Sequence, residues 1–157
     1  MFMQNPKLTL LLSFFIIAVL SCVSSRNAEP SRIGIVPLHQ FKANEASLNA
    51  DTLYKVTRNA EEFDASFTSL VGTNTRPDFH AQMAVAMLLK NATTAGLQFE
   101  KAEVEGSTVN IYLRSCAGTA TENCLKGNAL IATIPKVGSA KKVRFFVNNS
   151  TRFIAGL

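Results

Sequence analysis

LQFEKAEVEGSTVNIYLR, residues 97–114, is the stretch of sequence that decides the fold. Apolar and polar residues alternate on both sides of Gly106 and Ser107, which is the period of two expected of a strand with one buried face. The Gly-Ser pair has the composition of a tight turn. The stretch therefore predicts an antiparallel hairpin with strands at 97–104 and 109–113.

Further strands are expected on both sides of this hairpin. Residues 83–89, MAVAMLL, are a continuous apolar run that fits a strand buried on both faces or a helix segment, and Pro77 with the nearby threonines favours the strand. Residues 32–39 predict a short strand, and Pro37 within them favours a sheet edge. Three more strands are predicted, at 53–57, 129–134 and 142–148. Residues 40–50 are polar and weakly patterned, which predicts a loop.

One helix is expected, at residues 59–71. Asn59 precedes Glu62 by three residues, an arrangement typical of a capped helix start. Apolar side chains then follow at helical spacing: Phe63, Phe67 and Leu70. Gly72 is placed to end the helix, and the phenylalanines are expected to pack in the core.

Composition and element order together predict the fold class. With 47% hydrophobic and 17% charged residues the chain is too apolar to be disordered, and 157 residues favour a single domain. The formal charge of +5 makes it mildly basic. One helix among many strands predicts a mainly β (α+β) domain, either an antiparallel β-sandwich or a curled sheet with the helix packed on it.

The N-terminus has the pattern of an export signal. Lys7 precedes the apolar run 8–20, which suits a signal peptide and is shorter than the roughly 20 residues that span a bilayer. The run ends at VLSC, which resembles a bacterial lipobox with Cys22 as the lipidated residue. We therefore expect residues 1–21 to be a lipoprotein signal peptide. Ordinary cleavage after Ser25 is the alternative, and it would also export the protein.

Lipidation would define both the domain boundaries and the location. Residues 22–31 are small and polar and contain Pro30, which predicts a tether, and residues 32–157 would form the single β-rich domain. Acyl chains on Cys22 would hold this domain to a membrane. The expected location is the extracytoplasmic side of the cell envelope.

Two further cysteines, Cys116 and Cys124, lie eight positions apart around a stretch of loop composition. In an oxidising compartment such a pair predicts a disulfide. A metal or redox site is the alternative, although redox motifs favour a two-residue spacing and zinc needs more ligands. His39 and His80 are far from the pair in sequence.

The search for catalytic motifs yields one weak candidate. Asp78 and His80 are two positions apart, so an extended backbone would place them on one face, where the carboxylate could orient the imidazole of a small hydrolase. The alternative is that Asp78 belongs to a turn after Pro77. The sequence has no glycine-rich phosphate loop, dinucleotide fingerprint, HExxH motif or calcium loop. We therefore expect no enzyme activity, cofactor, metal or small-molecule substrate.

Basic residues gather near the C-terminus: Lys136, Lys141, Lys142, Arg144 and Arg152. They lack the interleaved aromatic residues of single-strand nucleic-acid sites, and nucleic acid is not an expected partner outside the cytoplasm. A solvated strand face explains them, and contact with anionic headgroups or with an acidic partner is the functional alternative.

The central motifs resemble the PrcB-like family of protease-complex subunits. Asp78-Phe79 leads into the apolar run 83–89, a Thr-rich turn and a hairpin follow, and a late strand ends at Ile134-Pro135. The likeness covers roughly residues 54–147. It implies an exported, non-catalytic protein that works as an accessory subunit of a protease complex. The family's turn carries paired glycines and an aromatic residue, where this chain has Ala95-Gly96-Leu97.

The same turn has a weaker likeness to chagasin-type inhibitors of cysteine proteases, which are β-sandwiches that insert loops into a protease cleft. The Arg-Pro-Trp loop of those inhibitors has no counterpart, because the chain lacks tryptophan. Both likenesses imply a loop that meets another protein. The candidate protein-binding residues are Asn91, Thr93, Thr94, Gly96 and Leu97.

Overall fold

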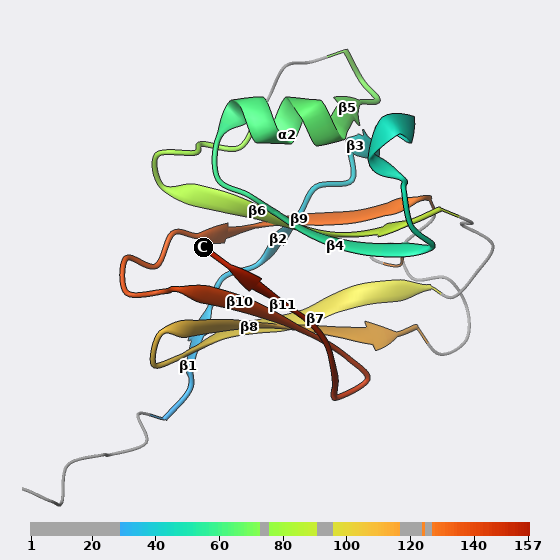
Figure 1. The fold of residues 1–157 in the computed structure, drawn as a ribbon. Coiled ribbons are helices and arrows are strands. Elements are labelled where there is room, and N and C mark those ends of the chain that lie inside the picture. The colour runs from blue at the N-terminus through green and yellow to red at the C-terminus, as the bar shows by residue number, and fades with distance from the viewer. Residues whose placement is uncertain (1–28, 73–75, 91–95, 117–123, 125–126) are drawn as a thin grey trace, which may run out of the picture.

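The computed structural model describes residues 29–72, 76–90, 96–116, 124 and 127–157. These residues fold mainly into strands, with one α-helix among them, and form two packed sheets and a third, partly helical layer (Figure 1). The predicted fold class, a mainly β sandwich with one packed helix, is confirmed.

The lower sheet in Figure 1 has five strands in the order β1-β7-β8-β10-β11. These are β1 (Ser31–Ile33), β7 (Leu97–Glu105), β8 (Thr108–Ser115), β10 (Lys142–Val147) and β11 (Ser150–Gly156). The predicted hairpin forms β7 and β8, which pair antiparallel as far as Glu105↔Thr108. Gly106 in their turn has a φ of +58°, which glycine adopts without the steric cost of a Cβ atom.

One strand pair in this sheet is parallel, contrary to the expectation of antiparallel pairing throughout. β10 runs beside β8 in the same direction, from Lys142↔Thr108 to Val147↔Leu113. Between these strands the chain crosses to the other sheet and returns, so β10 starts at the same end of the sandwich as β8. β11 then runs back beside β10 and forms the sheet edge.

The second sheet has four strands in the order β2-β9-β6-β4. These are β2 (Val36–Pro37), β9 (Ala129–Pro135), β6 (Gln82–Leu89) and β4 (Thr52–Thr57). The apolar run is the central strand β6, as predicted, and side chains on both of its faces are buried. Met83, Val85 and Met87 face the five-stranded sheet, and the alternate residues face the third layer.

The third layer covers the outer face of the four-stranded sheet. It contains α2 (Ala60–Ser66), the short 3-10 helix η1 (Glu45–Ser47), β3 (Phe41–Ala43) and β5 (Phe67–Ser69). Phe63 of α2 is fully buried, and its ring centroid lies 4.9 Å from those of Phe41 and Phe67 and 5.6 Å from that of Phe79. The phenylalanines therefore pack in the core, as expected.

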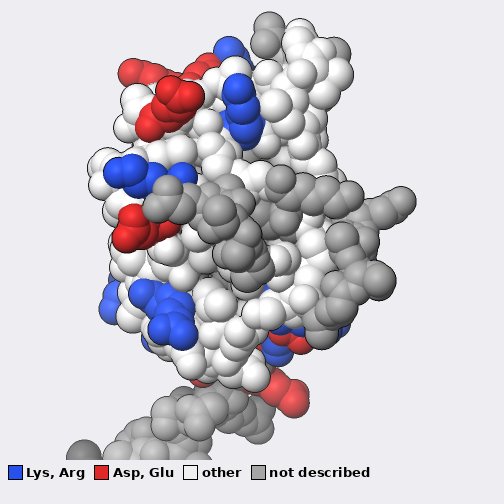
Figure 2. Space-filling model, turned by 90° about the vertical axis from the view of Figure 1, so that its right-hand side faces the viewer, with Lys and Arg blue, Asp and Glu red and all other residues white. Residues whose placement is uncertain are grey.

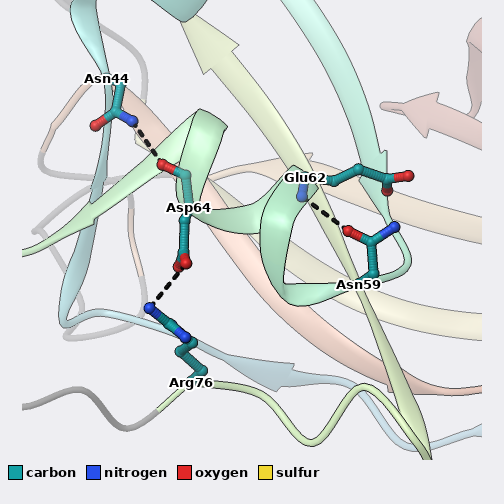
Figure 3. Close-up of polar contacts among 5 residues, drawn as sticks. All are labelled: Asn44, Asn59, Glu62, Asp64 and Arg76. Carbon is teal, nitrogen blue, oxygen red and sulfur yellow. Dashed lines mark hydrogen bonds and ion pairs between the residues drawn. The ribbon is translucent and has the colours of Figure 1, made fainter.

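The helix is shorter than predicted. Asn59 caps its start, because the side-chain oxygen accepts a hydrogen bond of 2.8 Å from the backbone N–H of Glu62 (Figure 3). The predicted end at residue 71 is wrong. The backbone becomes extended at Phe67 and continues as β5, which pairs with β3. Phe67 is thereby buried, whereas Leu70 is left 58% exposed.

Polar contacts tie this layer together at its surface. The Asp64 carboxylate lies 2.8 Å from the Arg76 guanidinium, and the Asp64 carbonyl accepts a hydrogen bond of 3.0 Å from the Asn44 side chain (Figure 3). Both charged side chains are nearly half exposed, so the ion pair contributes little to stability. It fixes where the chain leaves the layer.

Three other sequence expectations need correction. Residues 32–39 divide between β1 in one sheet and β2 in the other, although Pro37 does lie in an edge strand, as predicted. Residues 40–50 contain β3 and η1 and are not a simple loop. The last strand, β11, was not predicted. The pairing partners of β1, β2 and β3 are distant in sequence, whereas β11 pairs with the adjacent strand β10.

Candidate functional site

The candidate binding loop starts and finishes at one end of the sandwich. We call this the loop end and define it by Lys90, Gly96, Cys116, Cys124 and Asn148, which lie at or next to the points where β6, β8 and β10 finish and β7 and β9 begin. In Figure 1 the end of β8 and the starts of β7 and β9 lie at the right. Asn91, Thr93 and Thr94 lie outside the described residues, as does the predicted lipidation site Cys22.

The predicted disulfide is present. Cys116 at the end of β8 bonds to Cys124, with the two Cα atoms 6.3 Å apart. The backbone N–H of Cys116 also donates a hydrogen bond of 2.5 Å to the carbonyl of Gly96, immediately before β7. The start of β7, the end of β8 and the segment before β9 are therefore held at one point.

Gly96 has a steric reason to be glycine. A Cβ atom placed on it would lie 2.9 Å from the Cβ and 3.3 Å from the Sγ of Cys116. The residue does not have a positive φ, so the requirement comes from the disulfide and not from the backbone conformation. This close approach was not visible in the sequence, where Gly96 stood out only by family resemblance.

Gly96 and Leu97 pack at the base of the candidate loop. The Leu97 side chain is 6% exposed and belongs to the core between the two sheets. Gly96 has no side chain and packs on the disulfide. The structure therefore places both candidate residues at the base of the neighbouring loop, and their part in binding stays a prediction.

A second clamp at the loop end was missed from the sequence. The Asn148 side chain accepts a hydrogen bond from the backbone N–H of Ser115 and donates one to its hydroxyl oxygen, both at 3.0 Å. Asn148 and Asn149 have φ values of 49° and 64°. Paired left-handed residues of this kind favour a two-residue hairpin turn. In the sequence, the adjacent residues Asn148 and Asn149 were the signal that could have revealed this turn. The turn joins β10 to β11 beside the disulfide.

The segment that contains the candidate pair Asp78 and His80 forms a turn. The Asp78 carboxylate accepts a hydrogen bond of 3.0 Å from the backbone N–H of His80, and its carbonyl accepts from Ala81 and Gln82. These contacts use the aspartate to shape the entry to β6, and they do not orient the imidazole. Both side chains are exposed. Within the described residues, no three His, Cys, Asp or Glu side chains are placed to hold a metal ion.

Two hollows lie near the loop end. A cavity of about 380 Å³ borders the disulfide and is lined in part by His39, Phe41, Leu70 and Cys124. A more polar groove of about 650 Å³ lies where the chain leaves β1 and crosses towards β2. Arg32, Gln98, Lys101 and Arg114 are among its lining residues. The arginines and the lysine favour an anionic occupant of this groove.

Burial and neighbouring charges perturb two groups beside the groove. Burial, and secondarily the Glu103 carboxylate, raises the pKa of Tyr112. A hydrogen bond to Glu103, 2.7 Å long, raises the pKa of Lys101. The ammonium group also lies 4.5 Å from the centroid of the Tyr112 ring. These three side chains therefore form one connected cluster on the outer face of the sheet, in which the lysine stays charged.

Comparison with known proteins assigns no relative to this structure. No family model, curated protein or solved structure matches the chain. None of the helices in the described part of the chain is long and apolar enough to cross a membrane.

Proposed function

We propose that this protein is a lipoprotein of the bacterial cell envelope that is held to a membrane through Cys22 and binds another protein without catalysing a reaction. The partner that fits best is a protease, for which the chain would act as an accessory or stabilising subunit. The sequence supports this through the lipobox and the PrcB-like order of motifs.

The observation that carries the proposal is the position of the tether relative to the loop end. β1 pairs with the far end of β7, with Ser31 opposite Val104, beside the Gly106 turn. Gly96 lies at the other end of β7. At about 3.3 Å per residue, the chain from Gly96 to Val104 separates the two points by roughly 26 Å. An anchor at the N-terminus would leave the loop end unobstructed.

The disulfide supports a binding role for this end. A loop whose two ends are fixed loses less conformational entropy when it binds than a loop on an unconstrained base. Here the disulfide and the Cys116–Gly96 hydrogen bond fix the point where β7 begins. The preceding loop thus starts from a rigid support, as recognition loops on β-sandwiches do.

The experiment is affinity capture of the mature lipoprotein from envelope extracts, with identification of what co-purifies. A substitution at the loop end, Thr94→Arg, is compared with Ser139→Arg, which lies in the exposed connection between β9 and β10 at the opposite end. We expect a protease to co-purify with the Ser139→Arg variant and to be lost with Thr94→Arg. The mass of the N-terminal peptide tests the lipid on Cys22 in the same sample.

The alternatives give different results in this experiment. Inhibition of a cysteine protease by the purified protein would favour the chagasin-like function instead. Recovery of no partner, together with a hydrolytic activity that His80→Ala removes, would refute the binding proposal. An N-terminus that starts at Arg26 without acyl groups would refute the anchor while leaving export intact.

A further inference from the structure

The outer face of the five-stranded sheet has no layer on it within the described part of the chain. The four-stranded sheet is covered on one side by this sheet and on the other by the helical layer (Figure 1). The five-stranded sheet packs only through its inner face, where Val109, Ile111 and Val143 are fully buried. The alternate residues of the same strands point outwards.

These outward positions are predominantly basic. The strand registers place five basic and two acidic side chains on this face, a formal charge of +3. The basic residues are Arg32, Lys101, Arg114, Lys142 and Arg144, and the acidic residues are Glu103 and Glu105. The two bulge residues of the sheet, Glu100 and Arg152, offset each other in charge. We call this surface the basic face.

Ring contacts hold the basic face in a fixed arrangement across three strands. The Lys101 ammonium lies 4.5 Å from the Tyr112 ring, the Tyr112 and Phe146 rings stack at 4.7 Å, and the Arg144 guanidinium lies 5.9 Å from Phe146. Because Lys101 and Phe146 occupy the Tyr112 ring, it is not a free platform for a sugar or a base. The face therefore recognises a ligand by charge.

The opposite side of the sandwich carries charges of both signs. α2 and η1 together contain four carboxylates and no basic residue: Glu45, Glu61, Glu62 and Asp64. Figure 2, which views the molecule from the loop end, shows acidic and basic side chains next to one another at the top, over the helical layer, and basic side chains at the lower left, over the five-stranded sheet. Lys42 of β3 and the Arg76 ion pair to Asp64 partly offset these carboxylates, so the excess of basic over acidic side chains lies on the five-stranded sheet.

The tether joins the sandwich on the basic side. β1 is an edge strand of the five-stranded sheet, and its Arg32 is part of the basic face. Nine peptide steps separate Cys22 from Ser31, and a fully extended chain of that length reaches about 30 Å. A lipid on Cys22 would therefore keep the basic face within about 30 Å of the bilayer, so that diffusion alone brings it to the headgroups.

We propose that the basic face docks onto the anionic headgroups of the membrane that holds the N-terminus. This inference rests on the lipid anchor of the proposed function. Docking turns the helical layer away from the bilayer, and it aligns the strands with the membrane plane. The loop end then points sideways, where it meets a neighbouring protein of the same membrane.

The experiment measures amine labelling of individual lysines in the mature lipoprotein reconstituted into vesicles. One set is phosphatidylcholine, and the other contains about one third phosphatidylglycerol. Lys101 and Lys142 report on the basic face, while Lys42 in β3 and Lys90 at the loop end are controls. We expect labelling of the first pair to be at least about threefold slower on the anionic vesicles. About 0.5 M NaCl should abolish this difference, and the controls should label equally on both.

Two matched double variants show whether the protection of Lys101 depends on the charge of the basic face or on the net charge of the whole protein. Arg114→Glu/Lys142→Glu should remove the protection of Lys101 on anionic vesicles. Lys42→Glu/Lys90→Glu makes the same change in net charge away from the basic face and should retain that protection. Far-ultraviolet circular dichroism and a cooperative thermal transition in both variants check that the sandwich is folded.

Several results would overturn the docking. These are equal labelling on the two kinds of vesicle, protection that survives high salt, and protection that requires added envelope extract, which would indicate an acidic protein on this face. The N-terminal peptide is read in the same digest. If it carries acyl groups and labelling is equal, the docking is wrong and the anchor stands. If it carries none, the anchor is wrong and the docking fails with it.

Discussion

The contact between Gly96 and the disulfide leads to a prediction that can be worked out from the structure. An alanine Cβ at position 96 would lie 2.9 Å from the Cβ of Cys116. One of the two chains must then move by roughly 0.5 Å to reach an ordinary contact distance. Neither moves easily, because the disulfide and the Cys116–Gly96 hydrogen bond hold both. Overpacking of this kind costs about 1–3 kcal/mol.

The disulfide should determine how large this cost is. In a Cys116→Ala/Cys124→Ala background, the end of β8 is no longer tied to the segment before β9 and can move away from position 96. The background change itself removes a cross-link closing a short loop and should cost about 2–3 kcal/mol. We expect Gly96→Ala to cost about 1 kcal/mol less there than in the disulfide-bonded protein.

The measurement is the free energy of unfolding in urea for the four proteins of this cycle, with the slope m compared to check two-state behaviour. Gly96→Ser, which adds a similar Cβ, should follow Gly96→Ala. The reasoning is refuted if Gly96→Ala costs less than about 0.5 kcal/mol with the disulfide intact. It is equally refuted if the cost is the same in both backgrounds, because the clash would then not depend on the disulfide.

Three further predictions concern the helical layer and the basic face. Asn59→Ala should lower the free energy of unfolding by about 1 kcal/mol in urea, since it removes the hydrogen bond to the N–H of Glu62; a change below about 0.3 kcal/mol would contradict the cap. Phe63→Ala should cost about 3–5 kcal/mol, because the ring is fully buried; a smaller loss would mean that the layer collapses around the gap. Tyr112, with its pKa raised above 10.0, should ionise in an ultraviolet titration at a higher pH than the unfolded chain. Its contribution to stability is full below the unfolded pKa and is lost as pH rises through the folded one, and Glu103→Gln should bring the folded pKa down.

The sequence predicts an element well when the pattern of apolar and polar residues inside that one segment is enough to identify it. β6 reads as one apolar run because both of its faces are covered, and the β7–β8 hairpin shows alternation on both sides of its turn. The helix end could not be predicted, since Phe67 satisfies helical spacing equally well. What converts it to a strand is pairing with β3, more than twenty residues earlier.

The candidate site likewise contains features that the sequence predicts and features that it does not. The disulfide follows from residue type, loop composition and compartment, all of which are local or general properties. The reason for Gly96 could not be predicted, because it arises from the approach of two chain segments twenty residues apart. The role of Asp78 was one of two alternatives in sequence, and only the hydrogen bond to the N–H of His80 shows that the residue shapes a turn.

The two bulges explain why a partner would meet this sheet at its end or its face and not along its edges. β11 is an open edge strand, and its pairing with β10 is interrupted at Arg152. β7 is paired with β1 only over residues 102–104, and its remaining edge contains the bulge at Glu100. A charged residue at a bulge twists the edge and disfavours an added strand. The open edges of β11 and β7 thus each contain an obstacle to an added strand, whereas the loop end and the basic face need no backbone pairing to bind.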